Sequence, residues 1–517
     1  MNTINKTIRQ SGLKIFLFLL ILFLGSGYMV QTTAQPVQSA TSLGLSGSGM
    51  AYISGPEATF WNPANLMIAD RPGRFHLSVG TGAFSFDPVF PESSVRTQLA
   101  SYRRAYRPYK PGSFQISKDR RQKILEMHYP GNTLLSTHRQ QADLLLAGAL
   151  WKTEHYSLSI ALRGRYGSTF KVGRGWYDGS SIQDGQQHIR DFSLIQRRSE
   201  LYELAIGYAR EFTFVNGLLP GANTLYIGIT PKFIVAGPHL NARYDARYLQ
   251  ETDEDIQPVF NTFSAEFKLQ SSGSHGQAFR QYRQNGRAQQ AIDDNFSSSY
   301  SFKPTGYGIG FDFGLNYVIP LGYRNFGDQA SKSLRIGLSF NDIGAVRYHK
   351  QPFTLESERD TTKAALQAPV QQMFTGAGGQ YINYLHRASS LPNPLLTADS
   401  PSEQSYTALL PTSINTGLLL DLKHLKLMGD LAIGLDNTAF SSKNIILNLG
   451  MEARLLKQIP IRLGTTLAKN RPFTLGLGTG LETRNWDFNL GTTLLLQSHS
   501  PEAYFTGGAF GGLQLHF

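Results

Sequence analysis

Few residues of this 517-residue chain are spaced for catalysis or for metal binding. The twelve histidines are scattered, and none has the H-E-x-x-H spacing that holds zinc on one face of a helix. The run Ser46-Gly47-Ser48-Gly49 lacks the full G-x-S-x-G pattern of a nucleophilic serine. The chain has no cysteine, so we expect neither disulfides nor a lipid-modified N-terminus. We predict no enzyme activity, no metal site and no cofactor.

Alternating glycines are the second candidate for chemistry. They occur at Gly308 and Gly310, and again at Gly476, Gly478 and Gly480. A phosphate-binding loop places its glycines in a turn between a strand and a helix. These glycines instead occupy every second position inside segments that have the alternation of strands. There the missing side chain leaves space in a lumen or lets another segment approach the backbone.

Three polar segments could bind ions or remain solvated. The segment YRRAYRPYKPGSFQISKDRRQK (102–123) mixes arginines and lysines with tyrosines, as nucleic-acid-binding surfaces do. On a cell surface we prefer lipopolysaccharide phosphate as its anion, and a simply solvated loop before either, so we expect no nucleic acid partner. The acidic segment ETDED (251–255) could hold Ca²⁺, but a solvated loop is the better default. The polar segment 271–290 is expected to be mobile.

The elements that must position any site show period-two alternation. In SLRIGLSFN (333–341) and PIRLGTTLA (460–468), apolar residues alternate with polar residues or glycine, which predicts strands with one apolar face. The segments are about ten to sixteen residues long, where soluble strands average nearer 5–6 and a tilted membrane strand needs about 9–11. The fold class predicted is therefore all-β, a transmembrane antiparallel β-barrel.

Fourteen such segments are predicted, and closed bacterial barrels have an even number of strands. Long gaps (87–141, 171–199, 237–305, 344–411) alternate with shorter ones, which predicts long extracellular loops and short periplasmic turns. The strands are expected at 74–86, 142–152, 155–170, 200–214, 224–236, 306–320, 333–343, 412–422, 425–436, 443–455, 459–468, 473–483, 485–497 and 507–517.

Full charges stand on the polar face of many predicted strands. A water-filled lumen accepts such groups, whereas the dry core of a β-sandwich does not. The residues predicted to face the lumen are Arg163, Arg165, Asp312, Arg335, Arg462, Glu482 and Asp487.

The N-terminal segment divides into an export signal and a compact plug. Residues 1–34 contain a basic region, the apolar run IFLFLLILFL and a small-residue cleavage site ending at Ala34, which predicts a signal peptide. Residues 35–73 follow as a hatch, and 74–517 form the barrel. Asn62 can cap a turn that begins at Pro63. Phe60, Trp61 and Leu66 then give the hatch an apolar face.

The stretch SGSGMAYISGPEATFWNPANL (46–66) resembles the N-terminal hatch of the long-chain fatty acid transporter (FadL-like) superfamily. It is about as similar to the shuttle and attachment barrels of the type IX secretion system. LRIGLSFNDIGAVRYHK (334–350) and the segment 459–494 resemble a Bacteroidota barrel family of unknown function within this superfamily. The final GGLQLHF, ending at Phe517, looks like the signal read by the barrel-assembly machinery.

These resemblances imply a protein of the bacterial outer membrane, in contact with lipid and lipopolysaccharide. The function expected is a passive channel for small hydrophobic molecules such as fatty acids. The alternative is a surface scaffold barrel that binds a secreted protein.

Overall fold

The structure is a computed structural model of the chain. It describes residues 39–68, 73–87, 122, 125–177, 182–184, 187–212, 223–251, 262–296, 303–321, 332–363, 382, 393–397, 401–441, 443, 445–467, 473–496 and 503–517. The predicted signal peptide (1–34), nearly all of the basic segment 102–123 and most of the acidic segment 251–255 lie outside the described residues.

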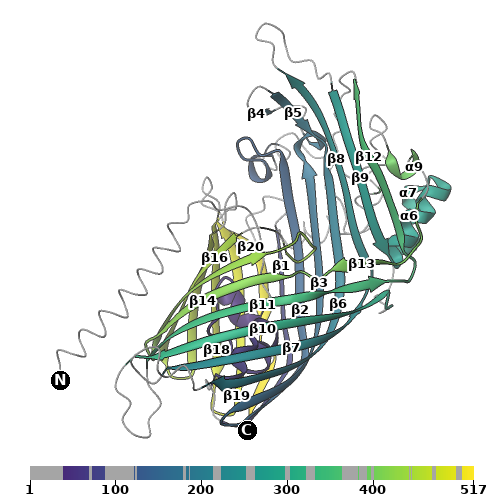
Figure 1. Ribbon diagram of the computed structural model, residues 1–517. Helices are drawn as coiled ribbons and strands as arrows, with labels where there is room; N and C mark the ends of the chain where they lie inside the picture. Colours follow the sequence, from purple (N-terminus) through teal and green to yellow (C-terminus); the bar gives the residue numbers. More distant parts are fainter. Residues whose placement is uncertain are drawn as a thin grey trace, which may run out of the picture.

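The described residues form a closed antiparallel barrel of 14 strands (Figure 1). The fold class predicted from the sequence is therefore confirmed. The wall strands are β1 (Phe75–Phe86), β2 (Leu135–Lys152), β3 (Tyr156–Gly173), β6 (Leu194–Phe212), β7 (Thr224–Ala236), β10 (Gly306–Pro320), β11 (Ser333–Tyr348), β14 (Ser413–Asp421), β15 (Leu425–Gly434), β16 (Ile445–Leu456), β17 (Ile459–Leu467), β18 (Phe473–Glu482), β19 (Trp486–Leu496) and a last strand in two halves, β20 (Ala503–Phe510) and β21 (Leu513–His516).

The barrel closes where the last strand pairs with the first. β1 is hydrogen-bonded to β2 on one side and to β20 and β21 on the other. The chain end takes part, because the Phe517 carbonyl accepts from the Arg74 amide at 2.7 Å and the Phe517 amide donates to Phe75 at 2.9 Å. Closure satisfies the backbone groups that an open sheet edge would leave unpaired in lipid.

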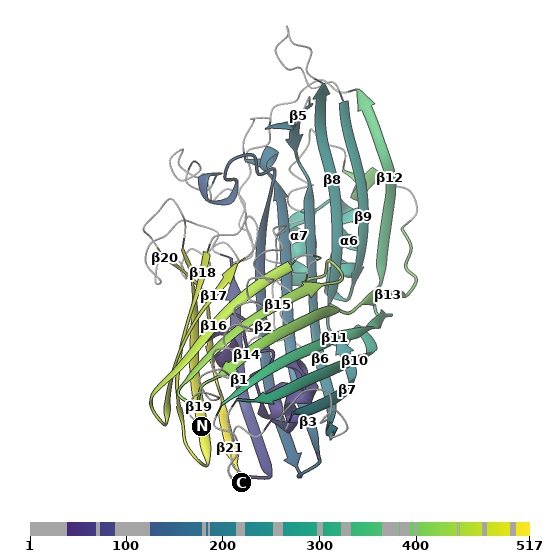
Figure 2. The same ribbon diagram turned by 60° about the vertical axis from the view of Figure 1, so that its left-hand side comes forward.

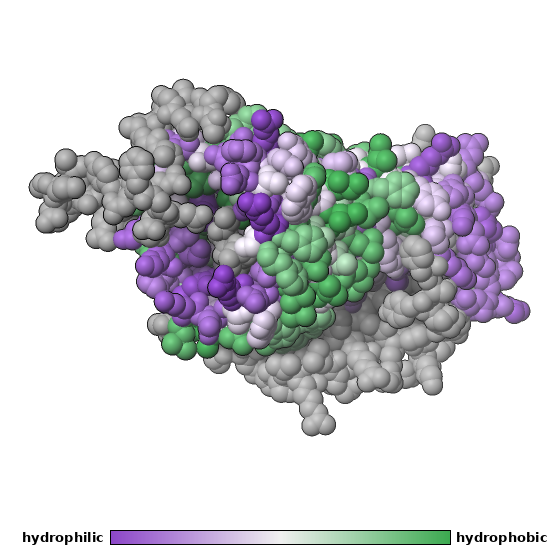
Figure 3. Space-filling view, turned by 90° about the horizontal axis from the view of Figure 1, so that it is seen from below, coloured by the Kyte–Doolittle hydropathy of each residue, from purple (hydrophilic) through white to green (hydrophobic). Residues whose placement is uncertain are grey.

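A hydrophobic belt encircles the wall, because alternate side chains point outward. Ile160, Ile206 and Ile309 are 51%, 51% and 73% exposed, whereas the inward-facing Arg163 and Ala205 are at most 1% exposed. Seen from below, hydrophobic side chains gather in a broad zone between hydrophilic ones (Figure 3). A closed barrel with an aliphatic belt outside and charges inside spans an outer membrane.

A tall extension continues the wall on one side only (Figures 1 and 2). The upper end of β6 pairs with β8 (His239–Glu251), which pairs with β9 (Thr262–Ser272), which pairs with β12 (Phe353–Lys363). Smaller elements complete it: η3 (Arg174–Trp176), β4 (Ile182–Asp184), β5 (Gln187–Asp191), β13 (Tyr406–Leu409) and the helices α6 (Ser274–Asn285), α7 (Ala288–Phe296) and α9 (Pro394–Thr397).

The extension corrects one expectation. The polar segment 271–290, expected to be mobile, contains all of α6 and the start of α7. Ala278, Phe279 and Tyr282 are almost completely buried in the same apolar cluster as Phe267 of β9 and Leu355 of β12. Their spacing along the chain puts them on one face of a helix. The segment is polar on average, but this apolar face packs against the core of the extension.

The plug, residues 39–68, lies inside the barrel (Figure 1). It consists of four short helices: α2 (Ala40–Gly44), η1 (Gly55–Glu57), α3 (Ala58–Trp61) and η2 (Pro63–Met67). Nearly every plug residue is buried. Across the described residues, no helix is both long enough and apolar enough to cross a bilayer.

Candidate functional site

Glycines in the wall let the plug and wall backbones approach each other closely. A Cβ added at Gly476 would lie 2.5 Å from the carbonyl oxygen of Leu43, and one at Gly478 would lie 2.9 Å from the Cα of Gly44. Both glycines therefore let the plug backbone approach β18, as the sequence predicted. The other predicted glycines differ, because Gly308 and Gly480 are crowded by wall atoms rather than by the plug.

Wall side chains also bind the plug backbone directly. The Asn341 amide donates to the carbonyls of Phe60 and Trp61 at 3.2 and 3.0 Å. Asp430 accepts from the amides of Gly49 and Met50. These plug groups have no access to water, so their wall partners supply the hydrogen bonds that buried polar groups require.

The predicted cap at Asn62 is present. Its side-chain oxygen accepts from the Ala64 amide at 3.1 Å at the start of η2, and Pro63 occupies the first turn. The same side chain donates to the Leu315 carbonyl of β10 at 3.0 Å. Asn62 thus shapes the plug and attaches it to the wall. Leu66, in η2, is fully buried.

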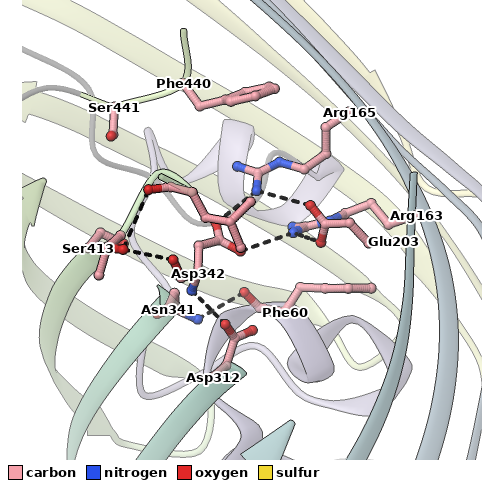
Figure 4. A network of polar contacts seen from close by, with 12 residues as sticks. Phe60, Arg163, Arg165, Glu203, Asp312, Asn341, Asp342, Ser413, Phe440 and Ser441 are labelled. Atoms are coloured by element: carbon pink, nitrogen blue, oxygen red, sulfur yellow. Dashed lines mark hydrogen bonds and ion pairs between the residues drawn. The ribbon is translucent and has the colours of Figure 1, made fainter. Parts of the chain in front are cut away.

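A layer of buried charges crosses the lumen above the plug (Figure 4). Arg163 contacts Glu203 at 2.5 Å, and Arg165 contacts Asp342 at 2.8 Å. Lys232 lies 2.7 Å from Asp312 and also contacts Asp342. We define the ion layer as three cations and four carboxylates from six strands: Asp143, Arg163, Arg165, Glu203, Lys232, Asp312 and Asp342.

The ion layer is held between two aromatic rings. The Arg163 guanidinium lies 4.0 Å from the ring centre of Phe60, in the plug. The Arg165 guanidinium lies 4.5 Å from the ring centre of Phe440, in the turn between β15 and β16. Such cation–π contacts strengthen when they are desolvated. The layer therefore connects the plug below to the turn above.

Above the ion layer, one sector of the inner wall is apolar, on β6, β7 and β11. Leu201, Ile234 and Val346 point inward from β6, β7 and β11 and are at most 2% exposed. They belong to an upper apolar layer that consists of Leu201, Ile234, Ala236, Val346, Tyr348, Leu410, Ala439 and Phe440. A water-filled pore would have polar groups at these positions, because wetting them is unfavourable.

A second charged cluster lies at the opposite, periplasmic end. Arg462 contacts Glu452 and Glu482 at 2.9 and 2.5 Å. The Tyr52 hydroxyl of the plug donates to Glu452 at 2.7 Å. Burial raises the pKa of Tyr52, which keeps the phenol protonated as a donor. Tyr52, Arg462 and Glu482 border a polar cavity of about 260 Å³.

The remaining predicted lumen residues lie near this cavity. Asp487 contacts His516 at 3.0 Å, and both residues line the cavity. Arg335 lies 3.8 Å from Asp421. The structure therefore divides the seven predicted residues: Arg163, Arg165 and Asp312 join the ion layer, and the other four lie toward the periplasmic end.

Sequence reasoning missed four residues of the ion layer: Asp143, Glu203, Lys232 and Asp342. Lys232 is the single charge of β7, and Glu203 stands on the inward face of β6 at the odd positions of its alternation, so the signal for both was present. Asp342 carries no such signal. It stands at an irregularity in the pairing of β10 with β11 and has a positive φ of 57°. Asparagine and aspartate tolerate this conformation better than other residues with a Cβ.

The closed wall, the lipid-facing belt and the N-terminal plug define an outer-membrane β-barrel protein with a filled lumen. The chain belongs to a family of unknown function (DUF5723), which matches residues 84–492. No curated protein matches it.

Two solved structures illustrate the likeness to known barrels. The toluene transporter TodX of P. putida is 10% identical, with 93% of this chain and 99% of that chain covered and a TM-score of 0.40. A FadL homologue of Pseudomonas aeruginosa is also 10% identical, with 95% and 99% covered and a TM-score of 0.37.

Proposed function

We propose that the protein is a plugged outer-membrane channel for small hydrophobic molecules. The observation that carries this proposal is the upper apolar layer, which places aliphatic side chains on the inner face of β6, β7 and β11. An apolar molecule entering from outside would exchange water for contact with these side chains. The ion layer and the plug then close the route toward the periplasm.

Passage requires the plug to loosen or to rearrange. The ion layer contacts Phe60 and the wall amides bind the Phe60 and Trp61 carbonyls, so the tip of the plug is the element whose movement would open the lumen. We infer that an apolar ligand in the upper layer competes for the aromatic contacts that Phe60 and Phe440 make with Arg163 and Arg165.

The test is binding of an apolar fluorescent dye to the purified barrel in detergent. Ile234→Asn places an unpaired polar group in the upper apolar layer and should weaken dye binding about tenfold. Ile234→Val keeps the surface apolar and should bind nearly as the unchanged protein does. Equal binding by all three proteins would contradict a hydrophobic site at this level, provided that each shows heat-modifiable migration on a gel.

A scaffold that holds a secreted protein is the second candidate. The observation in its favour is the tall extension, in which β8, β9 and β12 form a sheet beyond the barrel mouth (Figure 2). A simple pore does not require it. Purification in mild detergent from native membranes decides this point: a stoichiometric protein partner supports the scaffold, and recovery of the barrel alone counts against it.

A further inference from the structure

The most exposed apolar side chains of the wall gather at the upper ends of β7, β10 and β13. Ile309 is 73% exposed and Leu409 65%, more than any other large apolar side chain among the residues that the structure describes. Ala345 of β11 pairs with both of them, so a small side chain stands between two that protrude about 10 Å apart. Phe233 of β7 pairs with Ile309 on its other side. We call Phe233, Ile309, Ala345 and Leu409 the apolar row.

A basic and aromatic patch follows directly above the apolar row. Arg347 and Tyr307 pair with each other, and each lies two residues beyond the row on its own strand, about 7 Å higher. The Tyr307 ring stacks on the His349 ring, with ring centres 5.6 Å apart. All three side chains are exposed, and so is that of Lys350 in the turn after β11. We call Tyr307, Arg347, His349 and Lys350 the rim patch.

The rim patch lies on the lipid-facing side of the wall, at its extracellular end. The alternate residues Val346 and Tyr348 point into the barrel and are at most 2% exposed. Tyr348 pairs with Gly306, which pairs with Ala236, and the extension strand β8 begins three residues later at His239. The patch therefore marks the height at which the hydrophobic belt ends and the outer leaflet has its head groups.

The cations of the rim patch have no carboxylate partner among the residues that the structure describes. Arg347 donates to the Ser405 hydroxyl at 3.1 Å, which holds the guanidinium at the rim. Glu403, two residues before Ser405, pairs with Arg280 at 2.7 Å instead. Neither Arg347 nor Lys350 takes part in an ion pair within the described chain. Cations at the edge of a bilayer attract anionic head groups, so the membrane itself can supply their partner.

The row and the patch together match a lipid that carries an anionic head group. Aliphatic side chains lie below, aromatic rings lie at the boundary and cations lie above, and a guanidinium can bind two oxygens of one phosphate. We propose that they bind the phosphorylated lipid of the outer leaflet, lipopolysaccharide, with an acyl chain against Ala345 and a lipid phosphate against Arg347 and Lys350. The site needs only the lipid-facing wall, so it does not depend on the proposed function.

The test measures the affinity of the purified full-length barrel, in a non-ionic detergent, for fluorescently labelled lipopolysaccharide. The double variant Arg347→Gln, Lys350→Gln should bind at least about tenfold more weakly, because both contacts with the phosphate lose their charge. Arg210→Gln is the matched control. Arg210 is also exposed, but it pairs with Tyr156 at the periplasmic edge of the belt, so its loss should change the affinity by less than about twofold.

Two further ligands separate lipid-borne phosphate from other sources of binding. Lipopolysaccharide stripped of its lipid phosphates should bind the unchanged protein about as weakly as intact lipopolysaccharide binds the double variant. Excess inorganic phosphate should displace little of the labelled lipid, because it makes no contact with the apolar row. The proposal is overturned if the stripped lipid binds as tightly as the intact one, if inorganic phosphate displaces the label, or if Arg210→Gln weakens binding as much as the double variant does.

Two single variants test the head-group contact and the acyl contact separately. The changed side chains are exposed, so each variant should keep its heat-modifiable migration on a gel. Arg347→Lys keeps the charge and should bind more tightly than Arg347→Gln. Ala345→Phe fills the space between Ile309 and Leu409, so it should weaken the binding of intact and stripped lipopolysaccharide alike. Equal binding by Arg347→Lys and Arg347→Gln would refute the role of charge, and unchanged binding by Ala345→Phe would refute the acyl contact.

Discussion

The plug should be released much more often when Asn341 is replaced by leucine. The Asn341 amide donates to the carbonyls of Phe60 and Trp61 at 3.2 and 3.0 Å, and leucine has a similar size but no donor. Each lost hydrogen bond costs about 0.5–1.5 kcal/mol net, and a buried carbonyl left unpaired moves the cost toward the upper end. Two such bonds give about 2 kcal/mol, which corresponds to about a 30-fold shift in the equilibrium between seated and released plug.

Conductance in planar bilayers measures this shift as the fraction of time that single barrels are open. The control is Thr416→Val on the adjacent strand, because the Thr416 hydroxyl donates to the Gly337 carbonyl within the wall and does not touch the plug. We expect the open fraction to rise about 30-fold in Asn341→Leu and to stay near the original value in Thr416→Val. If both variants leak equally, the wall has loosened and the plug argument fails. If neither leaks and both form barrels, another element seals the lumen.

Three further predictions concern the plug. Asn62→Leu removes a cap worth about 0.5–2 kcal/mol, so the barrel should still insert with heat-modifiable migration while small solutes leak in a liposome-swelling assay; failure to insert would show that the hatch is needed for assembly. Gly464→Val puts a side chain against the backbone of Leu45, so the plug cannot seat, and limited proteolysis should cut the hatch faster than in the unchanged protein; equal cutting rates would show that the contact is adjustable. Burial raises the pKa of Glu57, so its charged form opposes seating at neutral pH; the leak should fall as pH drops from the raised pKa to the ordinary value, and Glu57→Gln should leak little at any pH. A leak that rises toward acid would reverse the sign of this argument.

The strands of the wall were predictable because lipid and lumen impose opposite demands on alternate residues. Strands β7 and β10 have the bounds predicted from the sequence, 224–236 and 306–320. The extension carries the same signal, with Leu240, Ala242 and Tyr244 alternating on one face of β8. The sequence nevertheless predicted a long loop over 237–305. The alternation of long and short gaps between barrel strands accounted for this segment without a further strand.

The site was less predictable, because it depends on which strands meet. Arg163 and Asp312 could be placed on the lumen face from their own strands, but their common neighbours Glu203, Lys232 and Asp342 join them only through the register of the barrel. The irregularity that turns Asp342 inward follows from tertiary pairing. No spacing of residues along the chain predicts that Asp342 faces the lumen.

The hydrogen bonds of the plug have a consequence for the order of folding. The Thr466 hydroxyl donates to the Ser46 carbonyl across 420 residues of sequence, and His76 meets His516 across 440. Contacts between such distant residues form slowly, because the entropy of closing a long loop is lost before the contact is made. The N-terminal segment is made first, yet its partners on β16 to β19 come near the end of the chain. Until then its apolar side chains have no wall to cover them, which leaves them open to aggregation while the barrel is incomplete.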